Sequence, residues 1–224
     1  MDISLNQITY ERLKKDIMTL ALKPGEPVSA SKIAARYGVS RTPAREALVR
    51  LQDEGMVDIY PQSKSEISKI KEGRIKQEWF VRKTLEMGMV DDFFDGVTEN
   101  DIKRMRECVR RLETLGMTPR DHESAYEYIQ RDDEFHRITY LAAGKSLAAD
   151  IIANTLPNYR RVRLLIDLEN TNKDRTIKDH LILIELAEKR DRERYREFIE
   201  EHISHVIKDM IDMKNLFPEM FEDG

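Results

Sequence analysis

The feature that most constrains the fold is a helical periodicity that runs from about residue 74 almost to the C-terminus. Apolar residues recur there at the three- and four-residue spacing of one helix face. Glycine and proline are scarce in the chain, with 9 and 7 copies, and 36% of the residues are charged. This composition favours helices with charged outer faces and argues against a β-sandwich. We therefore predict a mainly α fold.

Short polar or glycine-containing breaks divide this region into six predicted helices, and helices joined by short loops are typical of an antiparallel bundle. The charged connector Lys69–Gly73 precedes them. We expect two domains, residues 1–70 and residues 74–224. The predicted helices span residues 74–94, 98–115, 122–143, 146–168, 174–189 and 191–214.

The first 68 residues follow a different plan, with three short helices and a hairpin. The first helix ends before the stop signal Pro24-Gly25, and the second is capped by Ser29 and ends at a glycine turn. The third begins at Ser40. Residues 56–60 and 65–68 are short enough to be the two strands of a hairpin. This order of elements predicts a winged helix-turn-helix.

Charge and composition limit the partners of the chain. The net charge is −4, but residues 1–68 hold 10 Lys and Arg against 9 Asp and Glu, which leaves this half free to approach phosphates. The single cysteine, Cys108, excludes an intramolecular disulfide and fits a reducing compartment. Neither a signal peptide nor an apolar run approaching the roughly 20 residues of a membrane span is present. We expect a cytoplasmic protein with no membrane partner.

The third predicted helix carries the side chains suited to reading DNA. Arg41 and Arg45 are four residues apart and share one face. Ser40 and Thr42 add hydroxyls near the helix N-terminus, where backbone N–H groups attract phosphate. Arginine is shaped for bidentate contact with guanine in the major groove. Two arginines alone would more often form a solvated face paired with Glu46 or a neighbour, and the helix-turn-helix pattern around them favours DNA.

Three segments of this half resemble the N-terminal domain of GntR-family bacterial regulators: Lys23-Pro-Gly-Glu26, Val39-Ser-Arg-Thr-Pro-Ala-Arg-Glu-Ala-Leu48 and Leu51-Gln-Asp-Glu-Gly55. The resemblance assigns contacts with double-stranded operator DNA to Arg41, Thr42 and Arg45, and a phosphate contact to Ser40. The wing departs from the family because its tip lacks the usual glycine. Lys64 in that tip remains a candidate for a minor-groove phosphate contact.

Histidines of the second half are candidates for a metal site. Asp132 and His136 are four residues apart on a stripe that should face inward, where polar residues require partners. His180 and His202 lie at similar distances from the corner at Arg190-Asp191, so in an antiparallel hairpin both stand roughly 15 Å from the turn. One carboxylate and three imidazoles suit a divalent metal. Separately satisfied core histidines are the alternative.

The other two histidines are weaker candidates, because His205 lies off the apolar seam of the last helix and His122 opens its own helix. Four ligands would leave one or two positions for water or an anion on a five- or six-coordinate metal.

Four segments of this half resemble the ligand-binding domain of the FadR-type subgroup, called FCD: Phe80-Val-Arg-Lys-Thr-Leu-Glu86, Asp132-Asp-Glu-Phe-His136, Asp179-His180 and Glu201-His202. Six helices resemble its VanR-like branch. The resemblance implies a divalent metal held by the tetrad Asp132, His136, His180 and His202, and a small carboxylate as effector. Zinc is the first candidate ion, with nickel, manganese or iron as alternatives.

Four further residues are candidates for the effector pocket. Arg82 suits a carboxylate, both by the resemblance and because its guanidinium binds carboxylates in a bidentate manner. Its alternative is an intrahelical pair with Glu86, four residues on. Asn154, together with Arg160 and Arg163, would line the pocket from a facing helix, and the alternative for each is a solvated face.

The function that these features favour is an effector-responsive transcriptional regulator. One recognition helix reads few base pairs, so we expect a homodimer on a palindromic operator, as repressor or activator. A metalloenzyme is the rival from another class, since an open position on a metal can activate water. No motif supplies a separate general base for it. Direct sensing of the metal itself is the third possibility.

Overall fold

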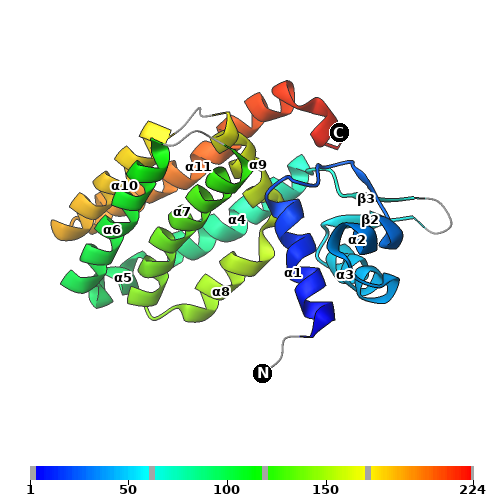
Figure 1. Cartoon of the computed structure of the whole chain (residues 1–224). Coiled ribbons are helices and arrows are strands. Elements are labelled where there is room, and N and C mark those ends of the chain that lie inside the picture. Colours follow the sequence, from blue (N-terminus) through cyan, green and yellow to red (C-terminus); the bar gives the residue numbers. More distant parts are fainter. Residues whose placement is uncertain (1–3, 61–63, 118–120, 170–172, 223–224) are drawn as a thin grey trace. The chain divides into compact units, whose positions relative to one another are not determined.

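The computed structural model of the chain describes residues 4–60, 64–117, 121–169 and 173–222 (Figure 1). The chain divides into two compact units. The first unit contains Met1–Glu72 together with Lys214–Gly224, and the second contains Gly73–Met213. Residues 214–224 thus belong with the first unit, outside the range expected for it.

The first unit contains three helices and a small antiparallel sheet whose strand order is β1-β3-β2. Ser29 caps the second helix by accepting a hydrogen bond from the Lys32 amide, and Gly38 ends it with φ at +68°. A positive φ of this kind favours glycine. The bounds are α1 Leu5–Met18, α2 Ala30–Tyr37, α3 Arg41–Asp53, β1 Pro27–Val28, β2 Val57–Ile59 and β3 Ser65–Ile67.

The predicted winged helix-turn-helix outline is confirmed in this unit. The third helix buries Ala44, Ala47, Leu48 and Leu51, the apolar face that its spacing indicates. Strand β1 is an addition to the predicted hairpin. It has two residues, which are too few to show the alternation of buried and exposed positions that indicates a strand. It pairs with β3 through Val28 and Ser65.

The second unit is entirely helical within the described residues, as predicted. Two of the six predicted helices are each divided in two. Pro157 begins a new helix because it lacks an N–H and disfavours helical geometry at Leu156. The other break falls at Met89, after the weak helix former Gly88. The bounds are α4 Glu72–Gly88, α5 Val90–Gly96, α6 Glu99–Gly116, α7 His122–Ala142, α8 Ser146–Thr155, α9 Pro157–Leu168, α10 Lys173–Glu188 and α11 Arg192–Leu216.

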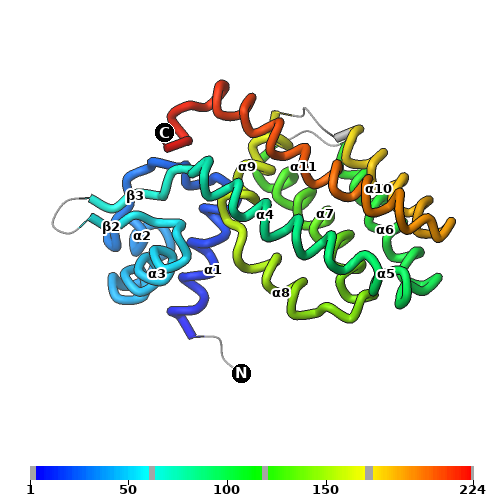
Figure 2. The backbone as a smooth tube through the Cα atoms, turned by 180° about the vertical axis from the view of Figure 1, so that it is seen from behind, coloured from blue at the N-terminus to red at the C-terminus, as the bar shows by residue number. Residues whose placement is uncertain are grey.

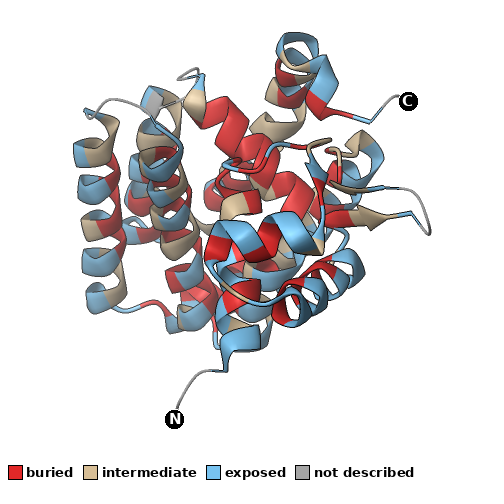
Figure 3. Ribbon diagram, turned by 45° about the vertical axis from the view of Figure 1, so that its right-hand side comes forward, coloured by how far each residue is buried: buried red, intermediate tan, exposed pale blue. Residues whose placement is uncertain are grey.

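Helix α7 is central to the core of this unit, because it packs against α5, α6, α8 and α9. Helix α6 contacts both α7 and α10 (Figures 1 and 2). The buried residues of the helices face their neighbours and the exposed residues face outward (Figure 3). Capping boxes fix the starts of two helices, with Thr98 and Asp101 at α6 and Asp121 and Ser124 at α7. Among the described residues, no helix has the length and apolar character of a membrane span.

The packing of α5 on α7 gives a stability prediction. A Cβ at Gly96 would overlap the backbone carbonyl oxygen of Ala142, whereas a Cβ at Gly88 would meet open space. We predict that Gly96→Ala lowers the free energy of unfolding by about 1–3 kcal/mol, through overpacking against a backbone that cannot move aside. Gly88→Ala, the matched control, should be neutral or stabilising by about 0.5–1 kcal/mol. Denaturant unfolding measures both, and equal losses would contradict the packing.

Candidate functional site

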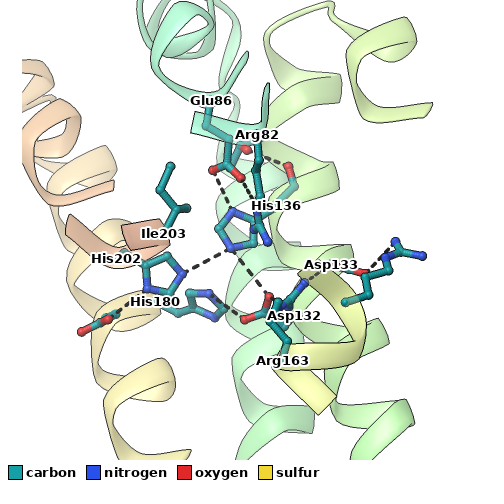
Figure 4. A network of polar contacts seen from close by, with 12 residues as sticks. Arg82, Glu86, Asp132, Asp133, His136, Arg163, His180, His202 and Ile203 are labelled. Carbon is teal, nitrogen blue, oxygen red and sulfur yellow. Dashed lines mark hydrogen bonds and ion pairs between the residues drawn. The ribbon is translucent and has the colours of Figure 1, made fainter. Parts of the chain in front are cut away.

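Four potential metal ligands from three helices of the second unit converge (Figure 4). Asp132 and His136 stand one turn apart on α7, and the 3.6-residue period turns both into the core. His180 comes from α10 and His202 from α11. One ligand atom from each of the four lies within 4.8 Å of the others. The structure therefore brings together the four residues that the sequence singled out.

The distances inside this tetrad are short. His180 Nε2 lies 3.4 Å from Asp132 Oδ1, and His136 Nε2 lies 3.9 Å from Asp132 Oδ2. The Nε2 atoms of His136 and His202 are 3.4 Å apart. Three imidazole nitrogens and one carboxylate thus face a common point, which is the donor set of many zinc sites.

Carboxylates outside the tetrad orient two of its imidazoles. His136 Nδ1 lies 3.0 Å from Glu86 Oε2, and His202 Nδ1 lies 2.9 Å from Asp179 Oδ2. A histidine that donates its Nδ1–H to a carboxylate presents the lone pair of Nε2 to the centre. The sequence interpretation did not assign this role to either carboxylate. The only signal for it was that Asp179 precedes His180 and that Glu86 ends a family-like segment of α4.

His180 is held differently, by stacking on Phe135 with 3.9 Å between ring centroids and 5° between ring planes. Its side chain is fully buried, and neither ring nitrogen has a hydrogen-bond partner within the described residues. A buried polar atom without a partner is unfavourable. An ion coordinated by His180 Nε2 would remove this penalty at that nitrogen, so the residues present fit a metal.

The ionisation of the tetrad also fits a metal. Burial lowers the pKa of His136, and it lowers the pKa of His180 far more. Both imidazoles are therefore neutral at pH 7, which is the form that binds metals. Burial alone would raise the pKa of Asp132, but the Arg163 guanidinium beside it holds that pKa well below its ordinary value.

Arg163 on α9 bridges two adjacent carboxylates. Its Nη2 pairs with Asp132 Oδ2, and its Nη1 donates to Asp133 Oδ1 at 2.7 Å. Arg160, one turn earlier on the same helix, pairs with Asp133 at 2.8 Å. Both arginines thus have carboxylate partners. Arg163 is buried, so the sequence alternative of a solvated face is wrong for it.

Arg82 forms the intrahelical pair that was the alternative to effector binding. Its Nε donates to Glu86 Oε1 at 2.7 Å, and both side chains are buried. Burial alone would raise the pKa of Glu86, but His136 and Arg82 beside it hold that pKa below its ordinary value. Arg82 also borders the cavity next to the tetrad, so the pair and a role in the site are compatible.

The cavity beside the tetrad has a volume of about 70 Å³, room for a few waters or the carboxylate end of a small acid. Asp132 and His202 border it, and so do the guanidinium-bearing side chains of Arg82, Arg163 and Arg175. The carboxylates of Asp132, Asp167, Asp179 and Asp209 share the wall with these three guanidinium groups.

Three other sequence candidates occupy different places. Asn154 does not border this cavity, because it is exposed and bonds to the Asp150 carbonyl of its own helix. His205 lines the cavity, with Nε2 3.5 Å from Asp179 Oδ2. His122 is exposed at the start of α7.

The side chains proposed to read DNA lie on α3 of the first unit. Arg41, Thr42 and Arg45 are exposed. Within the part of the chain that the structure describes, neither arginine forms an ion pair, with Glu46 or with any other residue. Ser40 occupies the N-cap position, but its hydroxyl makes no capping hydrogen bond.

The wing is described on both sides of its tip. Lys64 pairs with Glu66 of β3 at 2.6 Å. The other residues of the tip, 61–63, lie outside the described residues.

Comparisons with known proteins match both halves of the chain. The family described as bacterial regulatory proteins, gntR family, matches residues 5–67, and the family described as FCD domain matches residues 79–205. The HTH-type transcriptional repressor RspR of Escherichia coli is 23% identical over 219 residues, which are 98% of this chain and 94% of that protein. An HTH-type transcriptional regulator of Streptomyces ambofaciens is 28% identical over 95% of this chain and 87% of its own length.

Solved structures share the fold. Escherichia coli McbR/YncC has a TM-score of 0.75 at 20% identity, over 96% of this chain and 100% of that chain. A transcriptional regulator, GntR, from Rhodococcus sp. RHA1 has a TM-score of 0.74 at 14% identity, over 94% and 99%.

The buried ion pairs of the site give a second stability prediction. Arg163→Met leaves Asp132 buried without its guanidinium partner, and we expect it to lower the free energy of unfolding by about 3–5 kcal/mol in metal-free protein. Arg160→Met is the matched control: it removes a partly exposed guanidinium from the same helix, and the expected loss is about 0–1 kcal/mol. Urea unfolding in the presence of a chelator measures both. Similar small losses would show that Arg163 does not balance the buried charge.

Proposed function

Because this chain belongs to the GntR family of bacterial regulatory proteins and carries an FCD domain, we propose that a small carboxylate bound beside a divalent metal controls its affinity for operator DNA. The chain is a transcriptional regulator, as its family and relatives indicate.

The observation that carries the proposal is the convergence of Asp132, His136, His180 and His202 beside an arginine-lined cavity. These four residues would hold the ion, with Glu86 and Asp179 fixing two of the imidazoles. A bound divalent ion would supply positive charge for an anionic ligand. Zinc is our first choice for this donor set, with nickel, manganese or iron as alternatives.

The cavity supports a carboxylate as the effector. Arg82 and Arg163 present buried guanidinium groups on its wall, and each already has a carboxylate partner. A carboxylate that enters the cavity would share these donors and take an open position on the ion. A ligand shifts a conformational equilibrium only by its differential affinity for the two states. Competition for Arg163 is one source of such a difference.

For DNA recognition, we propose that Arg41 and Arg45 contact base edges, with Thr42 and Ser40 near the phosphates. Support comes from the exposure of these side chains and from the absence of an ion pair at either arginine within the described residues. Lys64 would contact a phosphate only after its ion pair with Glu66 breaks. We further propose a homodimer, because one recognition helix covers only part of a palindromic operator.

The DNA proposal predicts the effect of two substitutions. A site selected from random double-stranded DNA should bind the wild-type chain tightly. Arg41→Ala and Arg45→Ala should each weaken that binding by about 1–3 kcal/mol and relax base preference at one position. The matched control is Arg110→Ala, which removes an exposed arginine from α6 of the second unit and should bind like the wild type. Fluorescence anisotropy measures the affinities. Unchanged binding by both variants would refute this assignment.

The metal proposal predicts which histidine matters. After dialysis against buffer without metal, the wild-type chain should retain stoichiometric zinc, and His180→Ala should lose it. His122→Ala, the matched control at an exposed histidine, should retain it. Asp179→Asn removes the carboxylate that orients His202, so its zinc affinity should fall about 10- to 100-fold. Chelator competition measures these affinities. Equal zinc content in His180→Ala and wild type would rule out the tetrad.

Direct sensing of the metal is the second candidate function, and the buried tetrad supports it as well. The two functions differ in the effect that zinc alone has on operator affinity. A direct sensor changes its operator affinity strongly when zinc replaces a chelator, whereas a carboxylate sensor responds further when a small acid is added to the zinc-loaded chain.

A further inference from the structure

The last residues of the chain form part of the winged unit. Phe221 pairs in parallel with Ile70, just beyond strand β3. The Ile70 amide donates to the Met220 carbonyl at 2.9 Å, and the Glu222 amide donates to the Ile70 carbonyl at 3.0 Å. The C-terminal segment thus forms a 3-10 helix at Pro218–Met220 and then a single β-bridge with the connector that leaves the wing.

Side chains secure this segment. Phe221 is 1% exposed, Met220 is 9% exposed and Ile70 is fully buried. Lys71 pairs with Glu222 at 3.6 Å. The segment is thus held by two main-chain hydrogen bonds, a buried aromatic side chain and an ion pair.

The same segment continues a helix of the metal site. Helix α11 carries His202 and runs on to Leu216, and the described residues after it lead directly to Phe221. The connector that Phe221 pairs with leads into α4, which carries Arg82 and Glu86. At the ends of these two helices, Lys214 pairs with Glu72 at 2.9 Å. Two segments lead from the site into the winged unit: the end of α11 and the start of α4. Hydrogen bonds and this ion pair join them.

We propose that residues 217–222, the C-terminal strap, couple the metal site to the winged helix-turn-helix. The inference rests on the proposed function. Ligation of His202 favours one placement of α11, and the strap transmits that placement to the connector that follows β3. Coupling between two sites requires an element whose arrangement both sites bias. The strap supplies that element because it is continuous with α11 and hydrogen-bonded to Ile70.

A strap with only a structural role would give a different result from a coupling strap. Loss of a structural strap would weaken operator binding equally with and without metal. Loss of a coupling strap would leave zinc binding and operator binding in place and remove the dependence of one on the other.

The test uses Phe221→Ala in the full chain, with Glu219→Ala as the matched control at an exposed position of the strap. Zinc affinity comes from chelator competition, and operator affinity is measured with zinc and with a chelator. Hydrogen exchange at the Ile70 amide reports docking of the strap independently of DNA and metal. We expect Phe221→Ala to lose protection at Ile70, to bind zinc like the wild type, and to bind operator equally with and without zinc.

A second variant keeps the test decisive if Phe221→Ala does not fold. Lys214→Glu places two carboxylates together at Glu72, and adding Glu72→Lys restores an opposite-charge pair. The single variant should reduce the zinc dependence of operator binding, and the double variant should recover it. Rescue by the exchanged pair would not occur if each residue acted separately.

Two results would overturn the inference, and they are distinguishable. If the wild type responds to zinc and Phe221→Ala responds to the same extent after losing protection at Ile70, the strap does not couple the units. If the operator affinity of the wild type is unchanged by zinc, with or without a small acid, the proposed function fails and the coupling role fails with it.

Discussion

The arrangement of the second unit depends on one buried carboxylate, Asp132. An ionised carboxylate in a protein core requires compensation, because burial removes its hydration. Arg163 supplies a full charge from α9, and His180 approaches from α10 to 3.4 Å. Three helices are thereby held at one point by electrostatics as well as by apolar packing. Replacing Asp132 or Arg163 alone would leave an uncompensated charge, so the two residues are expected to act as a unit.

Other charged residues surround Asp132 and its partners. Glu86 and Asp179 each accept from one imidazole, and Arg82 in turn balances Glu86. The buried charges around the tetrad are thus balanced, whereas neither ring nitrogen of the neutral His180 has a hydrogen-bond partner within the described residues. That exception is what distinguishes a ligand site from a core of satisfied polar groups. A fully satisfied network would require no ion.

The sequence predicted the metal tetrad and the recognition helix because both depend on short-range spacing. Asp132 and His136 share a helix face whatever the tertiary structure, and Arg41 and Arg45 do the same. Asn154 does not border the cavity, and its helix ends before Pro157, whereas the sequence predicted one continuous helix over residues 146–168. Pairing between residues far apart in the sequence, such as His136 with Glu86 or Ile70 with Phe221, has no local signal. These contacts required the structure.

The most direct test of the account is zinc K-edge X-ray absorption of the zinc-loaded chain. We predict that three imidazole nitrogens and one or more oxygens surround the zinc at about 2.0–2.2 Å, without sulfur. The spectrum of His180→Ala, if zinc binds at all, should lose one imidazole. A shell that contains sulfur from Cys108, or a spectrum unchanged in His180→Ala, would contradict the claim that the four converging residues are a metal centre.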